Sequence, residues 1–188
     1  CKYDYIARMD TDDISLPRRF KDQITFLNDN KDIDIIGSYV FECGEDENNI
    51  TGIRKVPISN KEIYESSKFR NPFNHPSVIY KKNKVIEAGG PKKFTDFDDY
   101  YLWLRMLNNK VKCINLDYPL LTMRAGASQA QRRGGLDYVY NEISLFYFAY
   151  KIHHINFLTF VFNIILRVPV RLLPYKLRYS LYKLLRKR

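Results

Sequence analysis

The chain has 188 residues, of which 45% are hydrophobic and 28% are charged. These proportions exclude an intrinsically disordered chain, and the length is sufficient for one domain with a hydrophobic core. The three cysteines lie far apart in the sequence. Their spacing fits neither a zinc site nor a disulfide framework, so we expect a reducing compartment.

The formal net charge of +10 is concentrated towards the C-terminus. Glu142 is the last acidic residue, and nine lysines and arginines follow it, which leaves a net charge of only +1 for residues 1–142. The sequence therefore predicts a nearly neutral globular part followed by a strongly basic one.

Residues 1–124 alternate between strand and helix patterns, which predicts an α/β fold with a mixed sheet. Ser15 is expected to cap a helix that has Pro17 in its first turn and an apolar face of Phe20, Ile24 and Leu27. The capping box at residues 59–62 starts a helix that runs to about residue 68. Strands are expected at 3–9, 34–41, 51–56, 77–80, 111–116 and 120–123.

Prolines exclude regular structure from residues 71–76, and a Gly-Gly-Pro turn follows at 89–91. A helix is expected at 98–107 and an amphipathic helix at 136–152. Residues 155–170 are strongly apolar but shorter than the roughly 20 residues of a membrane-spanning helix. Pro174 is expected to open a last, basic helix.

An acidic cluster, Asp10-Thr11-Asp12-Asp13, follows the first strand directly. Three carboxylates within four residues repel one another unless a cation lies between them. Mg²⁺ and Mn²⁺ prefer oxygen ligands and can also bridge phosphates. Because α/β sheets bind ligands at the carboxyl ends of their strands, this position favours a metal site. In the alternative, one aspartate caps the next helix and the others face water.

Three further groups could carry chemistry. Asp98 and Asp99 open a helix, where one carboxylate could take a proton from a sugar hydroxyl or simply cap the helix. His75 is held between two prolines and could face a substrate or make a structural hydrogen bond. Arg132 and Arg133 precede two glycines and suit a diphosphate, with a solvated loop as the alternative.

Four segments of the chain form a characteristic series: residues 5–19, 32–38, 71–78 and 97–105. In this order they resemble the inverting family 2 glycosyltransferases of bacterial capsule, exopolysaccharide and O-antigen synthesis. The resemblance covers roughly residues 3–145 and implies the GT-A fold, a mixed sheet flanked by helices. It further implies that residues 1–135 are the C-terminal part of the catalytic domain, whose nucleotide-binding half is missing. Residues 136–188 would then be a helical, basic, membrane-associating tail.

The resemblance implies inverting transfer of a sugar from a nucleotide-sugar, typically a UDP-sugar, to a lipid-linked or saccharide acceptor. Asp12, with Asp10, would hold Mn²⁺ or Mg²⁺ on the donor diphosphate, and Asp10 would also contact the nucleotide-sugar. Asp99 would be the general base. Asp98 replaces the family's usual glutamate, so both acids stay candidates. The substrate-binding candidates beside Asp10 are His75, Trp103, Arg132 and Arg133, with Trp103 packed beneath the base.

The tail combines leucines, aromatic residues and cations, which predicts a helix pair on an anionic membrane surface. The resemblance places that surface at the cytoplasmic face of the bacterial cell membrane, whereas packing on the domain is the alternative. The apolar content of the tail argues against nucleic acid as a partner, although a basic module of that kind is a competing function. Two further competing functions are a metal-dependent phosphohydrolase and a non-catalytic remnant of a transferase.

Overall fold

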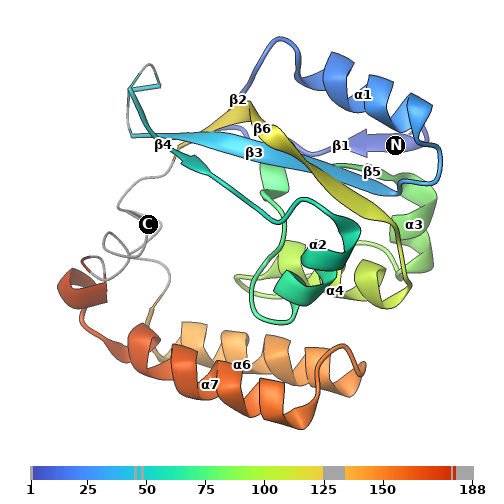
Figure 1. Ribbon diagram of the computed structural model, residues 1–188. Coiled ribbons are helices and arrows are strands. Elements are labelled where there is room, and N and C mark those ends of the chain that lie inside the picture. The colour runs from blue at the N-terminus through green and yellow to red at the C-terminus, as the bar shows by residue number, and fades with distance from the viewer. Residues whose placement is uncertain (1, 45, 48, 125–133, 179, 181–188) are drawn as a thin grey trace. The chain divides into compact units, whose positions relative to one another are not determined.

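The computed structural model describes residues 2–44, 46–47, 49–124, 134–178 and 180 (Figure 1). The chain forms two compact units. The first comprises residues 1–92 and 99–124, and the second comprises residues 93–98 and 125–188. The predicted arginines Arg132 and Arg133 lie outside the described residues.

A six-stranded sheet is the framework of the first unit (Figure 1). Strands β3 and β6 pair in parallel, and every other pair is antiparallel, so the sheet is mixed. Helices flank it on both sides. The predicted α/β fold with a GT-A-like mixed sheet is therefore confirmed. The strands in spatial order are β1 (Tyr5–Ala7), β5 (Ile79–Lys81), β3 (Ile35–Cys43), β6 (Cys113–Arg124) and β2 (Ile14–Ser15), and β4 (Ile50–Arg54) also pairs with β3.

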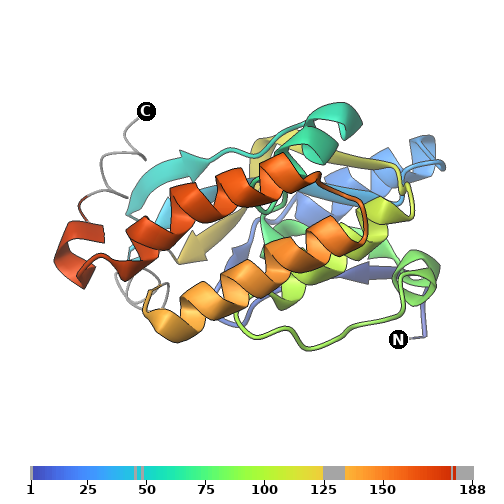
Figure 2. The ribbon, with the colours of Figure 1, turned by 90° about the horizontal axis from the view of Figure 1, so that it is seen from below.

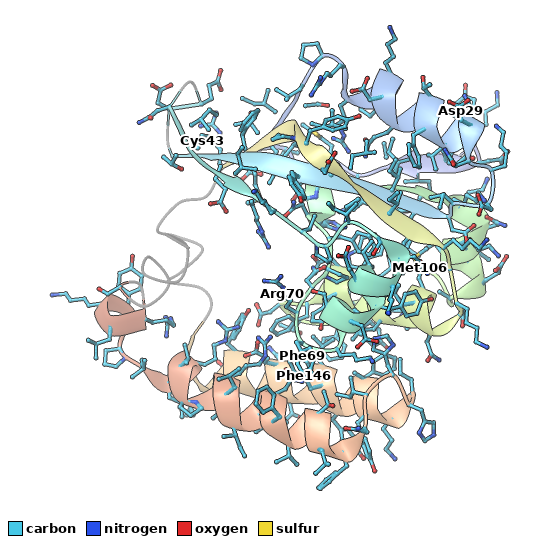
Figure 3. All side chains as sticks on the ribbon, viewed as in Figure 1. Asp29, Cys43, Phe69, Arg70, Met106 and Phe146 are labelled. Carbon is cyan, nitrogen blue, oxygen red and sulfur yellow. The ribbon has the colours of Figure 1, made fainter. Side chains whose placement is uncertain are left out.

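Each face of the sheet has its own core because neighbouring residues of a strand point to opposite faces. Ile36 packs with Leu27 of helix α1, whereas Ile35 packs with residues of the helices on the other face. That second cluster contains Trp103 and Met106, both fully buried, and Met106 is labelled in Figure 3. The helices of this unit are α1 (Arg19–Asp29), α2 (Asn60–Ser67), α3 (Lys82–Glu87) and α4 (Asp98–Asn108, which begins in the second unit).

Helix α2 begins at its predicted capping box. The hydroxyl of Ser59 accepts a hydrogen bond from the backbone N–H of Glu62, and the Glu62 carboxylate accepts one from the backbone N–H of Ser59. This reciprocal pair satisfies two backbone donors that the first turn of a helix leaves without partners. The predicted helix at 98–107 is also confirmed, as α4.

The predicted start of α1 is wrong. Ser15 belongs to β2, where it pairs with Leu121, and the helix begins only at Arg19. Phe20, predicted to face the core, is 49% exposed. The buried face instead carries Arg19, Gln23 and Leu27. Backbone carbonyls in the interior accept hydrogen bonds from the two polar side chains, which makes their burial possible.

Two other segments differ from the sequence prediction. The two strands predicted at 111–116 and 120–123 form the single strand β6, with an irregular register against β3 around Pro119. A short 3₁₀ turn, His75–Ser77, lies in the loop that was predicted to lack regular structure. Proline is compatible with this turn because it stands in the first two positions, where a backbone N–H is not needed.

The second unit is built on helices α6 (Leu136–Lys151) and α7 (Phe157–Leu172), which lie side by side (Figures 1 and 2). A further helical segment begins at Tyr175. Glu142 of α6 is buried and forms ion pairs with Arg167 and Arg171 of α7. Within the ranges that the structure describes, no helix is both long and apolar enough to cross a membrane.

Candidate active site

The acidic cluster forms the turn between β1 and β2. The backbone N–H of Asp13 donates to the carbonyl of Asp10 at 3.2 Å, which closes this turn. Arg124, at the end of β6, holds it from the other side. Its backbone N–H donates to the Asp13 carboxylate at 3.1 Å, and its guanidinium donates to the Asp12 carbonyl at 2.9 Å. Asp13 is therefore part of the scaffold, while Asp12 is exposed.

Burial raises the pKa of Asp13 to about 6, against its ordinary value of 3.8. The hydrogen bond from the Arg124 backbone N–H acts in the opposite direction, and the charges of Asp12 and Asp10 add to the increase. A carboxylate that is disfavoured by neighbouring anions gains from a nearby cation. The electrostatics of the turn thus favour binding of a positive ion.

The raised pKa makes a testable contribution to stability. The native protein holds this proton up to about pH 6, whereas the unfolded chain releases it near 3.8, so the contribution is present at low pH and is lost as the pH rises through 6. Asp13→Asn keeps an acceptor for the Arg124 N–H but does not titrate. Allowing for solvent screening at this partly exposed group, we expect the variant to gain about 1–2 kcal/mol on wild type between about pH 4 and about pH 8.

Urea unfolding of both proteins across this pH range measures the difference in the free energy of unfolding. A difference that stays constant with pH would contradict the assignment of the raised pKa to Asp13.

The acidic turn fits a metal ion that is shared with a substrate. Among the described residues, no group of three or more histidines, cysteines, aspartates and glutamates could hold an ion by itself. Magnesium sites commonly use only one or two carboxylates and complete their coordination with water and substrate phosphates. Asp10 and Asp12 offer two carboxylates in one turn, so they suit an ion carried on a diphosphate.

Arg8 connects the acidic turn to the loop of residues 71–78. Its Nε donates to Nε2 of His75 at 3.0 Å, and its backbone N–H donates to the carbonyl of Val78 at 2.9 Å. Beneath it, the fully buried Arg19 donates to the Arg8 carbonyl at 2.7 Å. Burial lowers the pKa of Arg19 to about 10, with the charge of Asp13 acting against this decrease, so its guanidinium stays charged at neutral pH.

Buried polar groups fix the same loop to the sheet. Asn74 donates to the carbonyl of Ser38 at 2.9 Å, and the Ser77 hydroxyl donates to the carbonyl of Asn74 at 2.8 Å. Asn115 of β6 donates to the carbonyl of Pro72 at 3.2 Å. These bonds lie away from water and hold the loop in one conformation.

Asp99 meets the other end of this loop. Its Oδ2 accepts a hydrogen bond of 2.6 Å from the side-chain amide of Asn71, and its Oδ1 accepts one of 2.7 Å from the backbone N–H of Tyr100. The carboxylate is partly buried and is thus held in a defined orientation. Asp98 is exposed, and it accepts a hydrogen bond from the backbone N–H of Phe94 in the segment that precedes α4.

Trp103 lies one turn further along α4 and has no exposed surface. Its ring packs against Phe73 at 5.3 Å, Tyr80 at 5.8 Å and His75 at 5.9 Å between ring centroids. The indole therefore supports the loop from beneath and offers no surface to a substrate.

The loop of residues 71–78 thus contacts the predicted base Asp99 and also Arg8, which lies just before the acidic turn. His75 is bonded to Arg8 beside the acidic turn, and Asn71 is bonded to Asp99. Arg8, Arg19 and Asn71 are not among the site residues predicted from the sequence. Their roles depend on contacts between distant segments, and only the spacing of Arg19, Gln23 and Leu27 on one helical face could have indicated a buried arginine.

No protein-family model matches the chain. The chain is 34% identical to the amylovoran biosynthesis glycosyltransferase AmsE of Erwinia amylovora over 183 residues, which are 97% of this chain and 68% of that protein. It is 39% identical to the UDP-Gal:alpha-D-GlcNAc-diphosphoundecaprenol beta-1,3-galactosyltransferase of Escherichia coli over 185 residues, 97% of this chain and 66% of the enzyme. It is 33% identical to the O-antigen biosynthesis glycosyltransferase WbnJ of Escherichia coli over 165 residues, 87% of this chain and 64% of that protein.

The chain spans about two thirds of the length of these relatives. The similarity extends over both units of the structure, including the acidic turn, the loop of residues 71–78 and the start of α4. With such identity over nearly all of its residues, the chain belongs to the family of glycosyltransferases from bacterial polysaccharide and O-antigen synthesis that includes these proteins.

Proposed function

We propose that the chain carries the metal-binding turn and the general base of an inverting glycosyltransferase of the hexosyltransferase type, which uses a nucleotide-sugar donor, in particular a UDP-sugar. The observation that carries the proposal is the loop of residues 71–78, which bonds to Arg8 beside the acidic turn and to Asp99. The loop would then fix the position of a donor diphosphate bound at the acidic turn relative to an acceptor hydroxyl bound at Asp99. The name of the Escherichia coli galactosyltransferase, with its UDP-galactose donor and diphosphoundecaprenol-linked acceptor, supports this choice of substrates.

In the proposed reaction, the acceptor oxygen attacks the anomeric carbon from the face opposite the nucleotide. The new carbon–oxygen bond forms as the bond to the diphosphate breaks, and the nucleoside diphosphate leaves with the bonding electrons. Asp99 takes the proton of the attacking hydroxyl. Its hydrogen bonds from Asn71 and Tyr100 hold the carboxylate in place, and the remaining lone pairs of its oxygens would be left for the acceptor hydroxyl.

Asp10 and Asp12 would hold Mn²⁺ or Mg²⁺ against the donor diphosphate. Such an ion, when bound, neutralises charge that develops on the leaving diphosphate. Asp13 and Arg124 keep the turn in shape, and Arg19 supports it from the interior. His75 is proposed to contact the substrate from the loop, with Arg132 and Arg133 as further ligands of the diphosphate.

A lipid-linked acceptor would place the enzyme at the cytoplasmic face of the bacterial cell membrane, as a peripheral protein. Membership of a glycosyltransferase family favours this function over a phosphohydrolase or a nucleic-acid-binding module. A hydrolase would use water and need no acceptor, and nucleic acid is not an expected partner.

The test uses the complete gene product and follows nucleoside diphosphate release from a panel of sugar nucleotides, with a membrane lipid extract as acceptor. We expect chelation to reduce release by about 100-fold or more and added Mn²⁺ or Mg²⁺ to restore it. Asp12→Asn should raise the metal concentration for half-maximal activity about tenfold. Asp29→Asn, an exposed aspartate in the last turn of α1, is the matched control and should behave as wild type.

Release that persists in the presence of chelator would overturn the proposed metal dependence. Release that needs metal but no lipid extract would point to hydrolysis.

A further inference from the structure

Helix α7 has the reverse of the polarity expected for a helix in water. Its polar residue Asn163 is only 1% exposed, while Arg167 and Arg171 turn towards α6. With about 100° of rotation per residue, the exposed apolar residues of α7, apart from Phe157 at its first position, fall within one stripe about 120° wide. The stripe consists of Leu158, Phe162, Ile165, Leu166 and Leu172, which are 51% to 76% exposed, and Pro169, which is exposed as well.

The contacts with α6 fix this orientation. The buried Glu142 accepts hydrogen bonds from Arg167 at 2.9 Å and from Arg171 at 2.7 and 2.8 Å. The two guanidinium groups also lie over α6 rings, that of Arg167 over Phe146 at 5.0 Å and that of Arg171 over Tyr138 at 4.8 Å. Rotating α7 to hide its apolar stripe would leave the carboxylate of Glu142 buried without its cations. The stripe therefore stays on the side of α7 opposite α6.

The charges around the stripe indicate what covers it. No acidic residue follows Glu142, whereas nine basic residues do. Lys151 precedes α7 and Lys176 follows it, and both are exposed. An apolar surface with cations at both ends matches an anionic bilayer, whose acyl chains take up the apolar residues while its headgroups attract the lysines and arginines.

Aromatic residues where the end of α6 meets the start of α7 are consistent with a bilayer as the partner. Tyr150 packs against Phe157 and Phe160 at 6.1 Å, and Tyr147 packs against Phe160 at 6.3 Å. Rings with polar edges are enriched at membrane–water interfaces. The 16 residues of α7 span about 24 Å, less than the hydrocarbon core of about 30 Å, which suits a helix lying along the surface.

We propose that α7 lies in the interface of an anionic bilayer, with its apolar stripe among the acyl chains and α6 on its water side. This inference rests on the proposed function in that a lipid-linked acceptor requires the enzyme at the bilayer. It adds the surface and the residues that make the contact.

The test measures co-sedimentation of the full chain with vesicles of phosphatidylcholine containing about one third phosphatidylglycerol, and with vesicles of phosphatidylcholine alone. The protein should bind the anionic vesicles more strongly. The double variant Leu158→Ser, Ile165→Ser should lower the partition coefficient about 30-fold or more. The matched control is Ile50→Ser, Ile53→Ser, which removes two exposed apolar residues from β4 and should bind as wild type. All four positions are exposed, so thermal unfolding should be unchanged.

A fluorescence measurement provides an independent readout. Trp103 is the only tryptophan and is fully buried, so Leu158→Trp adds a reporter on the stripe. Its emission should shift to the blue when anionic vesicles are added, and brominated lipids should quench it. Equal vesicle binding by the stripe variant and wild type, or an unshifted reporter, would overturn the proposal. Conversion of a dimer to a monomer with unchanged vesicle binding would show that a second copy covers the stripe.

Failure of this proposal can be told from failure of the proposed function. With a short-chain, water-soluble acceptor, the stripe variant should keep its transferase activity. Asp99→Asn should lose transferase activity but keep vesicle binding. If the wild-type protein binds vesicles but has no transferase activity, the proposed function is refuted and the proposed membrane contact of α7 is not.

Discussion

Asp99→Asn is expected to lower kcat for sugar transfer by about 10²- to 10⁴-fold, the range that a positioned general base contributes. An asparagine has nearly the same shape and can still accept the hydrogen bond from the Tyr100 backbone N–H, but its amide nitrogen replaces the oxygen that accepts from Asn71. What it cannot do is take the proton of the acceptor hydroxyl. Steady-state kinetics of nucleoside diphosphate release at saturating acceptor measure the effect, with KM for the donor expected to change little.

Asp98→Asn is the matched control for this variant. Asp98 is the adjacent aspartate at the start of α4, but it is exposed and accepts a local backbone hydrogen bond. We expect its kcat to stay within about tenfold of wild type. Equal losses in both variants, or a larger loss for Asp98→Asn, would assign the base to Asp98 or to neither residue.

Trp103→Ala is expected to reduce the free energy of unfolding by about 3–5 kcal/mol, because it removes a fully buried ring from the core. The cavity would lie beneath the loop of residues 71–78, where the indole contacts Phe73 and His75. Urea unfolding measures the loss. Phe69→Ala, at an aromatic residue that is 40% exposed and labelled in Figure 3, should cost less than about 1 kcal/mol. If Trp103→Ala lowers the free energy of unfolding by less than the about 1 kcal/mol of the Phe69→Ala control, the ring does not support the loop.

Much of the fold follows from local sequence patterns. The capping box at Ser59 defines the start of α2, and the β-branched run from Asp34 predicts the strand β3. These features depend on neighbours a few residues away, which the sequence displays directly. The α/β class follows because such elements alternate along the chain.

Buried polar residues explain where the prediction of α1 failed. Apolar periodicity selected Phe20 as a core residue, but Arg19 and Gln23 occupy the interior instead. Their burial is stabilised by carbonyls of Arg8 and Ser77, which belong to other segments of the chain. Helix α7 shows the same effect, since its inward arginines are explained only by Glu142 on α6.

The candidate acidic residues could be selected from the sequence, but the residues that hold the candidate groups in place could not. The acidic turn and Asp99 stand out in the sequence as charge clusters at element boundaries. Asn71 donates to Asp99 across 28 positions, and Arg8 donates to His75 across 67. Pairs that are this far apart in the sequence are brought together only by the complete fold, so no local sequence pattern predicts them.

The product of the reaction distinguishes transfer of a sugar to an acceptor from hydrolysis of the donor. The complete gene product is incubated with a radiolabelled sugar nucleotide, metal and a bacterial lipid extract, and the lipid fraction is counted after extraction. We predict label in the lipid fraction with wild type, and about 100-fold less or lower with Asp99→Asn. Label that appears as free sugar, at the same rate with or without the extract, would show that the protein is a hydrolase and not a transferase.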